Sequence, residues 1–584
     1  MRVNLISLGS EGPPTPRLYD SLVEVYRVRH YSSRTEEAYI HWIQRYTEFH
    51  SRFLSYSFLA KENDMISRTV THFRFWLLAV IVTAGSSDSL LAETTTVYVV
   101  RHAEKEQQTL NELIETLLDS ELADQTRPLT PQGMQRALDL RDLLRFEGVK
   151  LDVLYSTHFL RTWQTAAPCL DLIKSQGPKK VWRYTAIDDL ANKISSMHSG
   201  KSILVVGHST QVEKIVERLT GKTVAPIGNQ FNNLFVVMTD GTRGTYERRS
   251  YGEFTATGTI NLSESDSIAI EEAEDISGVA VMKDGSLLIV SDESKNAVQV
   301  IKKDGVTYVA QRPLRIVENE DDELDLEAVT RQPNSQRYFA VGSHSSRRRQ
   351  IYKKHASKTD EERRERFEDK SPDRESHREQ IFRFEIDDEG QLKNVESKDL
   401  QNAIRSHKLL SHFFNRKIND EKDDAIPSKE NGIDIEGIAW HDDKLYIGLR
   451  GPVLRWNFVP VMIVDFDNLD NANVRYVQLD GRGIRDLVRI NNGFLILAGA
   501  NGDEPLSFQL YFWNGKNCFP GEINKRSPHV VLLGTVPTPP GSKAEGIAVL
   551  NLDDQDAKNY ELLVIYDGLQ GGRPTRYLLP RANR

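Results

Sequence analysis

A short motif that recurs five times after residue 262 constrains the fold of this chain more than any other feature. Each copy combines an acidic residue or its substitute, a small residue and an apolar run, and then leads through a turn into an apolar strand. The copies begin at Asp275, Asp325, Asp434, Ile484 and Lys543. Recurring strand pairs with turn signals are typical of a β-propeller, whose blades bury their faces against neighbouring blades. The sequence therefore predicts an all-β propeller over 262–584.

Within this region, the stretch 347–380 is dominated by charged side chains of both signs. A mixed charge run with almost no apolar residues cannot build a core, and we expect a solvated insertion, either helix or loop.

Before the repeats, between residues 95 and 240, strands and helices alternate. Residues 96–100 and 203–206 are short apolar strands, and 130–146 has the leucine periodicity of a helix. Such alternation predicts a largely parallel sheet with helices on both faces. We therefore expect a three-layer α/β domain over 93–250, which makes the chain a multidomain protein.

Length and charge limit the classes of function. With 584 residues the chain is too long for a single hydrophobic core. Its formal net charge of −9 argues against binding nucleic acid along its whole length, because phosphate contacts need a basic excess. The two cysteines, Cys169 and Cys518, are expected in different domains and make no disulfide framework.

An apolar run at 73–85 follows basic residues and leads into small and polar ones. It is too short for a stable membrane span, which needs about 20 apolar residues. We read 65–92 as a signal peptide with Met65 as the working start, and the alternative is a buried helix. Translation from Met65 predicts a periplasmic or secreted protein, whereas any other start predicts a cytoplasmic one.

The segment 1–64 has a different, helical character. Amphipathic turns over 17–50 include a helix start with a capping box at Ser33 and Glu36. The stretch HYSSRTEEAYIHWIQRY resembles the N-terminal core-binding helices of integron-type tyrosine recombinases. DNA is an expected partner only if residues 17–50 are functional, and the recombinase catalytic residues have no counterpart later in the chain. The alternative is a relic or a fused fragment.

Basic side chains follow three of the expected strands. Arg101 and His102 follow the first strand, Arg161 lies just beyond another, and His208 follows 203–206. Ligands of parallel sheets bind beyond the carboxyl ends of the strands, so these four side chains can surround one tetrahedral dianion. Arginine suits this task because its planar fork pairs with phosphate oxygens.

The motifs VYVVRHAEK, LTPQG, YSTHFLRTWQTA and VVGHS occur in this order. They resemble the histidine phosphatase (phosphoglycerate mutase-like) superfamily. The resemblance implies that His102 is the nucleophile and that Arg101, Arg161 and His208 bind the phosphoryl group, without a cofactor. The implied substrate is a small phosphorylated molecule or a phosphohistidine protein. The alternative is a periplasmic binding protein that lacks catalysis.

Two departures from the family pattern matter. Ala103 stands where glycine usually follows the histidine, and we expect its methyl group to be tolerated. A carboxylate general acid is not marked by the usual pattern, and Glu104, Asp188 and Asp189 are the candidates. Because a poor leaving group needs a proton, the sequence favours activated esters or phosphohistidine as substrates.

In the propeller, we assign an acid to one equivalent position in four repeats, with Ser277 in the fifth. These acids are Glu327, Glu436, Asp486 and Glu545. If they converge on the axis, calcium would neutralise them, whereas otherwise each caps its own turn. This half resembles a bacterial domain of unknown function related to esterase-like phytase propellers, which implies phosphoester or sugar-phosphate binding.

Overall fold

The structure is a computed structural model, and several stretches of the chain lie outside its description. The described residues are 94–106, 124–174, 179–240, 243–264, 268–294, 296–318, 323–346, 356–368, 376–419, 422–502, 504–519, 527 and 529–581. The expected recombinase-like segment (1–64) and signal peptide (65–92) lie outside these residues. Residues 90–584 form one compact unit.

The first domain contains a six-stranded sheet in the order β3-β2-β4-β1-β5-β6. The strands are β1 (Thr95–Arg101), β2 (Val153–Ser156), β3 (Val181–Arg183), β4 (Ser202–Gly207), β5 (Asn233–Thr239) and β6 (Gly244–Ser250). Strands β1 to β4 pair in parallel, and β5 and β6 join antiparallel. The central strands are apolar on both faces because helices cover both.

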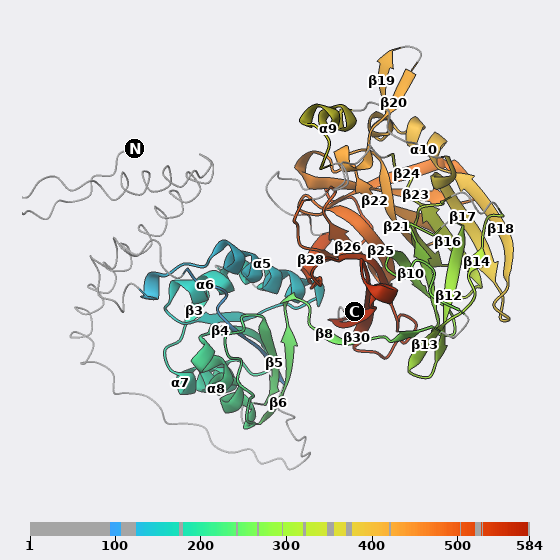
Figure 1. The fold of residues 1–584 in the computed structure, drawn as a ribbon. Coiled ribbons are helices and arrows are strands. Elements are labelled where there is room, and N and C mark those ends of the chain that lie inside the picture. The colour runs from blue at the N-terminus through green and yellow to red at the C-terminus, as the bar shows by residue number, and fades with distance from the viewer. Residues whose placement is uncertain are drawn as a thin grey trace, which may run out of the picture. The chain divides into compact units, whose positions relative to one another are not determined.

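Helices separate onto the two faces of this sheet (Figure 1). They are α5 (Pro131–Phe146), α6 (Leu160–Ala166), α7 (Ile187–Met197) and α8 (Ser209–Thr220), with the 3-10 helix η2 (Ala167–Leu172) after α6. Leu140 and Leu144 of α5 belong to one hydrophobic core, and Ile194 and Ile215 of α7 and α8 belong to the other. The expected three-layer α/β arrangement is therefore present.

Five further sheets form the blades of a propeller. Blade one contains β10 (Ile276–Val281), β11 (Leu287–Ser291), β12 (Ala297–Asp304), β13 (Thr307–Ala310), β9 (Leu262–Ser263) and β14 (Leu314–Arg315). Blade two contains β15 (Leu326–Arg331), β16 (Arg337–Gly342), β17 (Gln380–Ile386) and β18 (Leu392–Asp399). Blade three contains β21 (Asp434–His441), β22 (Lys444–Gly451), β23 (Phe458–Asp465) and β24 (Asn468–Gln478).

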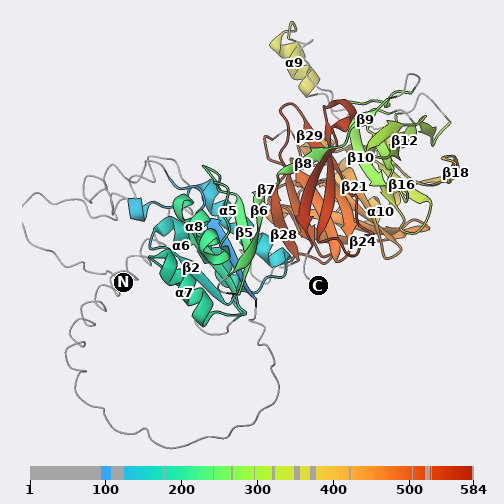
Figure 2. The same ribbon diagram turned by 90° about the horizontal axis from the view of Figure 1, so that it is seen from below.

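The last two blades recruit strands from the N-terminal side of the propeller. Blade four contains β25 (Gly483–Ile490), β26 (Gly493–Gly499), β27 (Gln509–Trp513), β28 (Val530–Thr535) and β7 (Gly252–Glu253). Blade five contains β29 (Lys543–Val549), β30 (Asn559–Asp567), β31 (Thr575–Pro580) and β8 (Ala256–Thr259). Figure 2 shows β7 and β8 beside the C-terminal strands. The propeller sheets thus include residues before 262.

The blades close into a ring. Strands β10, β15, β21, β25 and β29 each contact the next, and β29 contacts β10. The five copies of the sequence motif are these innermost strands, which confirms the predicted propeller. Ring closure protects the edges of the inner strands and buries apolar residues between neighbouring blades.

The α/β domain contacts the propeller through α5. Phe146, at the end of this helix, packs into a propeller core, and its ring centroid lies 5.1 Å from that of Phe512. Together with the pairing of β7 and β8, this contact joins the two domains within one compact unit.

Further short elements lie in the connections between the blade strands. They are α9 (Asp360–Phe367), α10 (Gln401–Ser406), α11 (Ser411–Phe414), and the hairpin β19 (Asn415–Asn419) and β20 (Lys422–Ala425). Helix α9 lies in the charged insertion, is capped by Thr359, and has no buried residue, as expected for a solvated helix. Across the described stretches, no helix is long and apolar enough to cross a membrane.

Candidate active site

Parallel pairing brings three strand ends to one edge of the α/β sheet. Arg101 is in register with Gly207 of β4, and the backbone N–H of His102 donates to the Gly207 carbonyl at 2.9 Å. Strand β2 pairs with the other edge of β4 and leads to Arg161. The predicted basic side chains therefore converge, because parallel strands end at the same edge.

The four predicted residues line one open pocket of about 930 Å³. Arg101, His102, Arg161 and His208 all contribute to its wall, together with residues of the LTPQG motif. The ring centroids of His102 and His208 lie 5.3 Å apart, edge to face. The pocket thus holds two imidazoles and two guanidinium groups, a suitable set for a phosphoryl group.

His102 is held in one tautomer. Its side chain is buried, and Nδ1 lies 2.7 Å from the backbone carbonyl oxygen of Ala103. A carbonyl oxygen only accepts hydrogen bonds, so Nδ1 carries the proton and Nε2 keeps its lone pair. Burial, together with the positive charges of Arg161 and Arg101, lowers the pKa of His102 to about 3. The imidazole is therefore neutral near pH 7, the form that can attack phosphorus.

His208 directly precedes α8 and is neutral for similar reasons. Burial, and then the positive charge of Arg161, lowers its pKa to about 4. Its Nε2 lies 3.1 Å from Oγ1 of Thr157, and its ring packs edge-to-face on Phe159. These contacts hold the ring beside His102.

Two motif residues shape the turn after β1. The Ala103 N–H donates to Thr165 Oγ1 at 3.0 Å, and the Ala103 methyl packs with Leu129 and Ala137. Thr130 caps α5 by accepting from the Gly133 N–H at 3.0 Å. A Cβ at Gly133 would collide with the backbone carbonyl of Glu104, so this close approach requires glycine.

Arg101 is positioned from the opposite wall of the pocket. It donates to the backbone carbonyls of Gly228 and Gln230 at 3.1 and 3.3 Å, and its guanidinium lies 4.1 Å from the Phe231 ring centroid. One terminal nitrogen of the Arg101 guanidinium is thus fixed by backbone carbonyls, which orients the remaining N–H groups.

Each of the three candidate general acids is paired with a basic side chain. Both carboxylate oxygens of Glu104 accept a hydrogen bond from Arg136 Nε, at 2.7 and 2.9 Å, in a largely buried ion pair. On α7, Asp188 pairs with Arg218 and Asp189 pairs with Lys193. Neither aspartate lines the pocket. The interpretation of Asp188 and Asp189 as acids is therefore wrong, because they face solvent on α7. Glu104 lines the pocket and stays a candidate, although it is paired with Arg136.

A carboxylate that the sequence analysis missed, that of Asp124, contacts two residues that line the pocket. Arg161 donates from Nη1 to the Asp124 backbone carbonyl at 2.7 Å and from Nη2 to its carboxylate at 3.0 Å. Lys105 Nζ lies 2.8 Å from the same carboxylate. Partial burial raises the pKa of Asp124, but Lys105 and Arg161 outweigh this and lower it overall. Nothing in the spacing around Asp124 marks it in the sequence.

The propeller acids occupy the first halves of the inner strands. In four of these strands the ladder skips one residue in a β-bulge at Ser277, Glu327, Glu436 or Glu545. In β25 the skipped residue is Arg485. Our assignment of Asp486 to the equivalent position is therefore wrong. Aligning the apolar residues rather than the acids would have found Arg485.

Arginines lie among these carboxylates. Arg485 forms ion pairs with Glu436, at 2.9 Å, and with Glu545. Arg450 pairs with Glu436 at 2.5 Å and with Asp434. Asp486 accepts the backbone N–H groups of Leu487 and Ile547.

Glu327 occupies the bulge of β15. Burial, and then the charge of Glu436, raises its pKa well above the usual value. The described residues contain no group of three or more His, Cys, Asp or Glu side chains arranged to hold a metal. Calcium binding at this ring stays a prediction.

Comparison with family models gives two matches. The model described as "Protein of unknown function (DUF3616)" matches residues 275–577, which span the propeller. The model of the phage integrase N-terminal SAM-like domain matches residues 18–73. The second match confirms the recombinase resemblance of the N-terminal segment and extends past Met65. No curated protein matches the chain.

Solved structures similar to this chain align with about a quarter of it. The protein histidine phosphatase SixA complexed with tungstate is 19% identical with a TM-score of 0.22, over 26% of this chain and 96% of that one. Phosphoglycerate mutase from Plasmodium falciparum is 14% identical with a TM-score of 0.18, over 26% and 89%. Ecdysone phosphate phosphatase from Bombix mori is 14% identical with a TM-score of 0.20, over 27% and 92%.

Proposed function

Since this chain belongs to the DUF3616 family of proteins of unknown function, its activity has to be sought in its own sites, and we propose that the α/β domain is a phosphatase working through a phosphoryl group on His102. The observation that carries the proposal is the hydrogen bond from His102 Nδ1 to the Ala103 carbonyl. It leaves Nε2 as the unprotonated nitrogen in a pocket that also contains Arg101, Arg161 and His208.

The reaction has two steps. Nε2 of His102 attacks phosphorus, the N–P bond forms, and the bond from phosphorus to the leaving group breaks. Water then attacks phosphorus, the N–P bond breaks, and inorganic phosphate leaves with the imidazole restored. Arg101 and Arg161 stabilise the charge on the equatorial phosphoryl oxygens, and His208 contributes a further hydrogen bond.

Asp124 is our candidate for the leaving-group acid. Without substrate its carboxylate binds Arg161 and Lys105. A phosphoryl dianion competes for Arg161 and repels the carboxylate, which raises the pKa of Asp124. Once protonated, Asp124 can donate its proton to the departing oxygen. This role extends the proposed substrates from phosphohistidine and activated esters to ordinary phosphomonoesters.

Trapping the phosphoenzyme tests the function. Rapid alkaline quench during turnover of p-nitrophenyl phosphate should leave base-stable, acid-labile phosphate on the wild type and none on His102→Ala. His412→Ala, which changes an exposed histidine of the propeller, is the matched control and should label like the wild type. Equal labelling of His102→Ala would contradict the proposal and favour a binding protein without catalysis.

A second candidate function rests on the N-terminal match. Because residues 18–73 match a phage integrase SAM-like domain, we propose DNA contact by this segment through Arg27, Arg29 and Arg34. The full chain should then shift duplex DNA at low salt, and replacing these three arginines with glutamine should abolish the shift. An unchanged shift would exclude this segment as the contact.

A further inference from the structure

The second halves of the inner strands enclose a cavity on the propeller axis. Its volume is about 380 Å³, and every blade contributes to its wall. Two residues beyond each bulge, the chain places an apolar side chain in the cavity lining: Val279, Val329, Ile438, Leu487 and Ile547. Pockets of this size with apolar walls and a few polar groups are typical of small-molecule sites.

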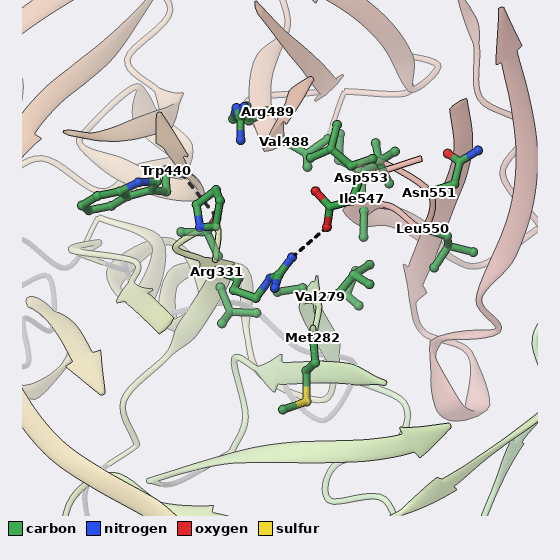
Figure 3. A pocket seen from close by; sticks show the side chains of 18 of the residues that line it. Val279, Met282, Arg331, Trp440, Val488, Arg489, Ile547, Leu550, Asn551 and Asp553 are labelled. Carbon is green, nitrogen blue, oxygen red and sulfur yellow. Dashed lines mark hydrogen bonds and ion pairs between the residues drawn. The ribbon is translucent and has the colours of Figure 1, made fainter. Parts of the chain in front are cut away.

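Two residues farther along, the lining changes character. The equivalent positions hold Val281, Arg331, Trp440, Arg489 and Val549. Figure 3 shows Arg331 reaching across the cavity toward Asp553, with which it forms an ion pair at 3.4 Å. Lys283 lies exposed at the rim. Basic groups are thus concentrated around an apolar cavity, although Asp553 and Asp554 also line it.

Arg489 is the group that points to a ligand. Its side chain is partly buried, and its Nε–H is buried without a hydrogen-bond partner. Among the described residues, no carboxylate lies within ion-pair distance of it. Arg450 and Arg485, in contrast, pair with carboxylates of the inner strands. A partly buried guanidinium without a nearby anion has lost some of its hydration without compensation, so an anionic group in the cavity would stabilise it.

We propose that this axial cavity binds a small organic anion carrying a phosphate or carboxylate group. Arg489 binds the anionic group, and Arg331 moves from Asp553 to share it. The carbon part of the ligand packs on the apolar wall, while Lys283 adds attraction at the rim. This site is separate from the phosphoryl pocket, since the two cavities share no lining residue.

Calorimetric titration of the full chain with phenylphosphonate tests the proposal, because a phosphatase does not cleave its C–P bond. We expect two sites in the wild type, one in each domain. Arg489→Met should weaken only the axial site, by about tenfold or more, since a charge-assisted pair is lost. Arg161→Met should weaken only the phosphoryl site. Arg312→Met, which changes an exposed arginine outside the cavity, should retain both.

These variants separate the two proposals. Loss of the axial site in Arg489→Met, with the other site intact, supports the inference whatever Arg161→Met does. Unchanged axial affinity in Arg489→Met, or a single site in the wild type that only Arg161→Met removes, would overturn it. If Arg489→Met fails to fold, Lys283→Met provides the test. Replacing this exposed lysine should weaken ligand binding at the axial site several-fold, because its positive charge is lost. Titration with benzoate shows whether a carboxylate is sufficient for binding or a phosphate-like group is needed. Titration with benzyl alcohol shows whether the site needs a charged group at all.

Discussion

Arg161 donates from both terminal nitrogens to Asp124, at 2.7 Å to the backbone carbonyl and at 3.0 Å to the carboxylate. The arginine predicted to bind phosphate is therefore occupied by an acid of the same chain. In the proposed reaction, the substrate and Asp124 would compete for this guanidinium, which would couple phosphoryl binding to the protonation of the carboxylate.

Asp124→Asn should separate binding from proton donation. Removing the competing charge should tighten the binding of inorganic phosphate by about tenfold. Turnover of an alkyl phosphate should fall by about 100-fold or more, because its leaving group needs a proton. Turnover of p-nitrophenyl phosphate should change little, since its leaving group departs as an anion.

Competitive inhibition by phosphate and the leaving-group dependence of kcat provide these measurements. Asp171→Asn, at an exposed position in the same domain, is the control and should match the wild type. Equal loss on both substrates would contradict the acid role of Asp124.

The low pKa values of His102 and His208 predict how activity depends on pH. Burial lowers these pKa values to about 3 and about 4. The nucleophile thus stays neutral well below pH 6.5, and kcat/KM for p-nitrophenyl phosphate should show no loss near pH 6.5 from the imidazoles. After correction for ionisation of the substrate, an acid limb with a midpoint near 6.5 would contradict the burial of these rings.

The same groups predict how stability depends on pH. Between pH 6.5 and about 4, the unfolded chain binds protons at these histidines and the folded chain does not. Their contribution to the free energy of unfolding is therefore complete above pH 6.5 and falls as the pH drops through this window. His102→Asn should reduce the slope of unfolding free energy against pH, measured by denaturant titration.

Arg485→Met should destabilise the propeller. The arginine joins Glu436 and Glu545 across three blades, and its removal leaves buried carboxylates without their cation. Breaking a buried pair from one side costs about 3–5 kcal/mol. Chemical denaturation of the full chain measures this loss, with Arg312→Met as the exposed control. A loss of unfolding free energy no larger than that of the control would mean that the carboxylates of Glu436 and Glu545 are protonated or bound to another cation.

The calcium prediction is tested by thermal unfolding of the full chain. Calcium in millimolar excess over chelator should raise the melting temperature of the full chain, and Glu327→Gln should remove the increase. Identical melting with calcium and with chelator would exclude calcium at the ring. The full chain is needed because β7 and β8, which complete two blades, precede residue 262.

The predicted signal peptide is tested on the native protein. We expect translation from Met65 and a mature N-terminus between Ala84 and Ala92, because a short apolar run separates basic from small residues there. Mass spectrometry of the N-terminal peptide and cell fractionation measure both. A mature chain that retains 18–73 in the cytoplasm would contradict export and favour the DNA-contact proposal.

Local patterns were enough to predict the two folds and the convergence of four basic side chains on one pocket. Strand ends carry their side chains to a sheet edge by parallel pairing, so Arg101, His102 and His208 could be placed together from sequence alone. The five inner strands were likewise visible, because each blade repeats the same strand and turn. Glu327, Glu436 and Glu545 share one position in their strands, but in the fourth repeat that position holds Arg485 and not the predicted Asp486.

Only the tertiary structure decided which partners the charged side chains have. Asp124 reaches Arg161 from a distant part of the chain, and Arg485 joins carboxylates of two other blades. The sequence by itself determined which strands form and which residues end them, since hydrophobic periodicity is a property of neighbours along the chain. Ion pairing depends on distances of a few ångströms between segments remote in sequence, and these distances exist only after the chain has folded.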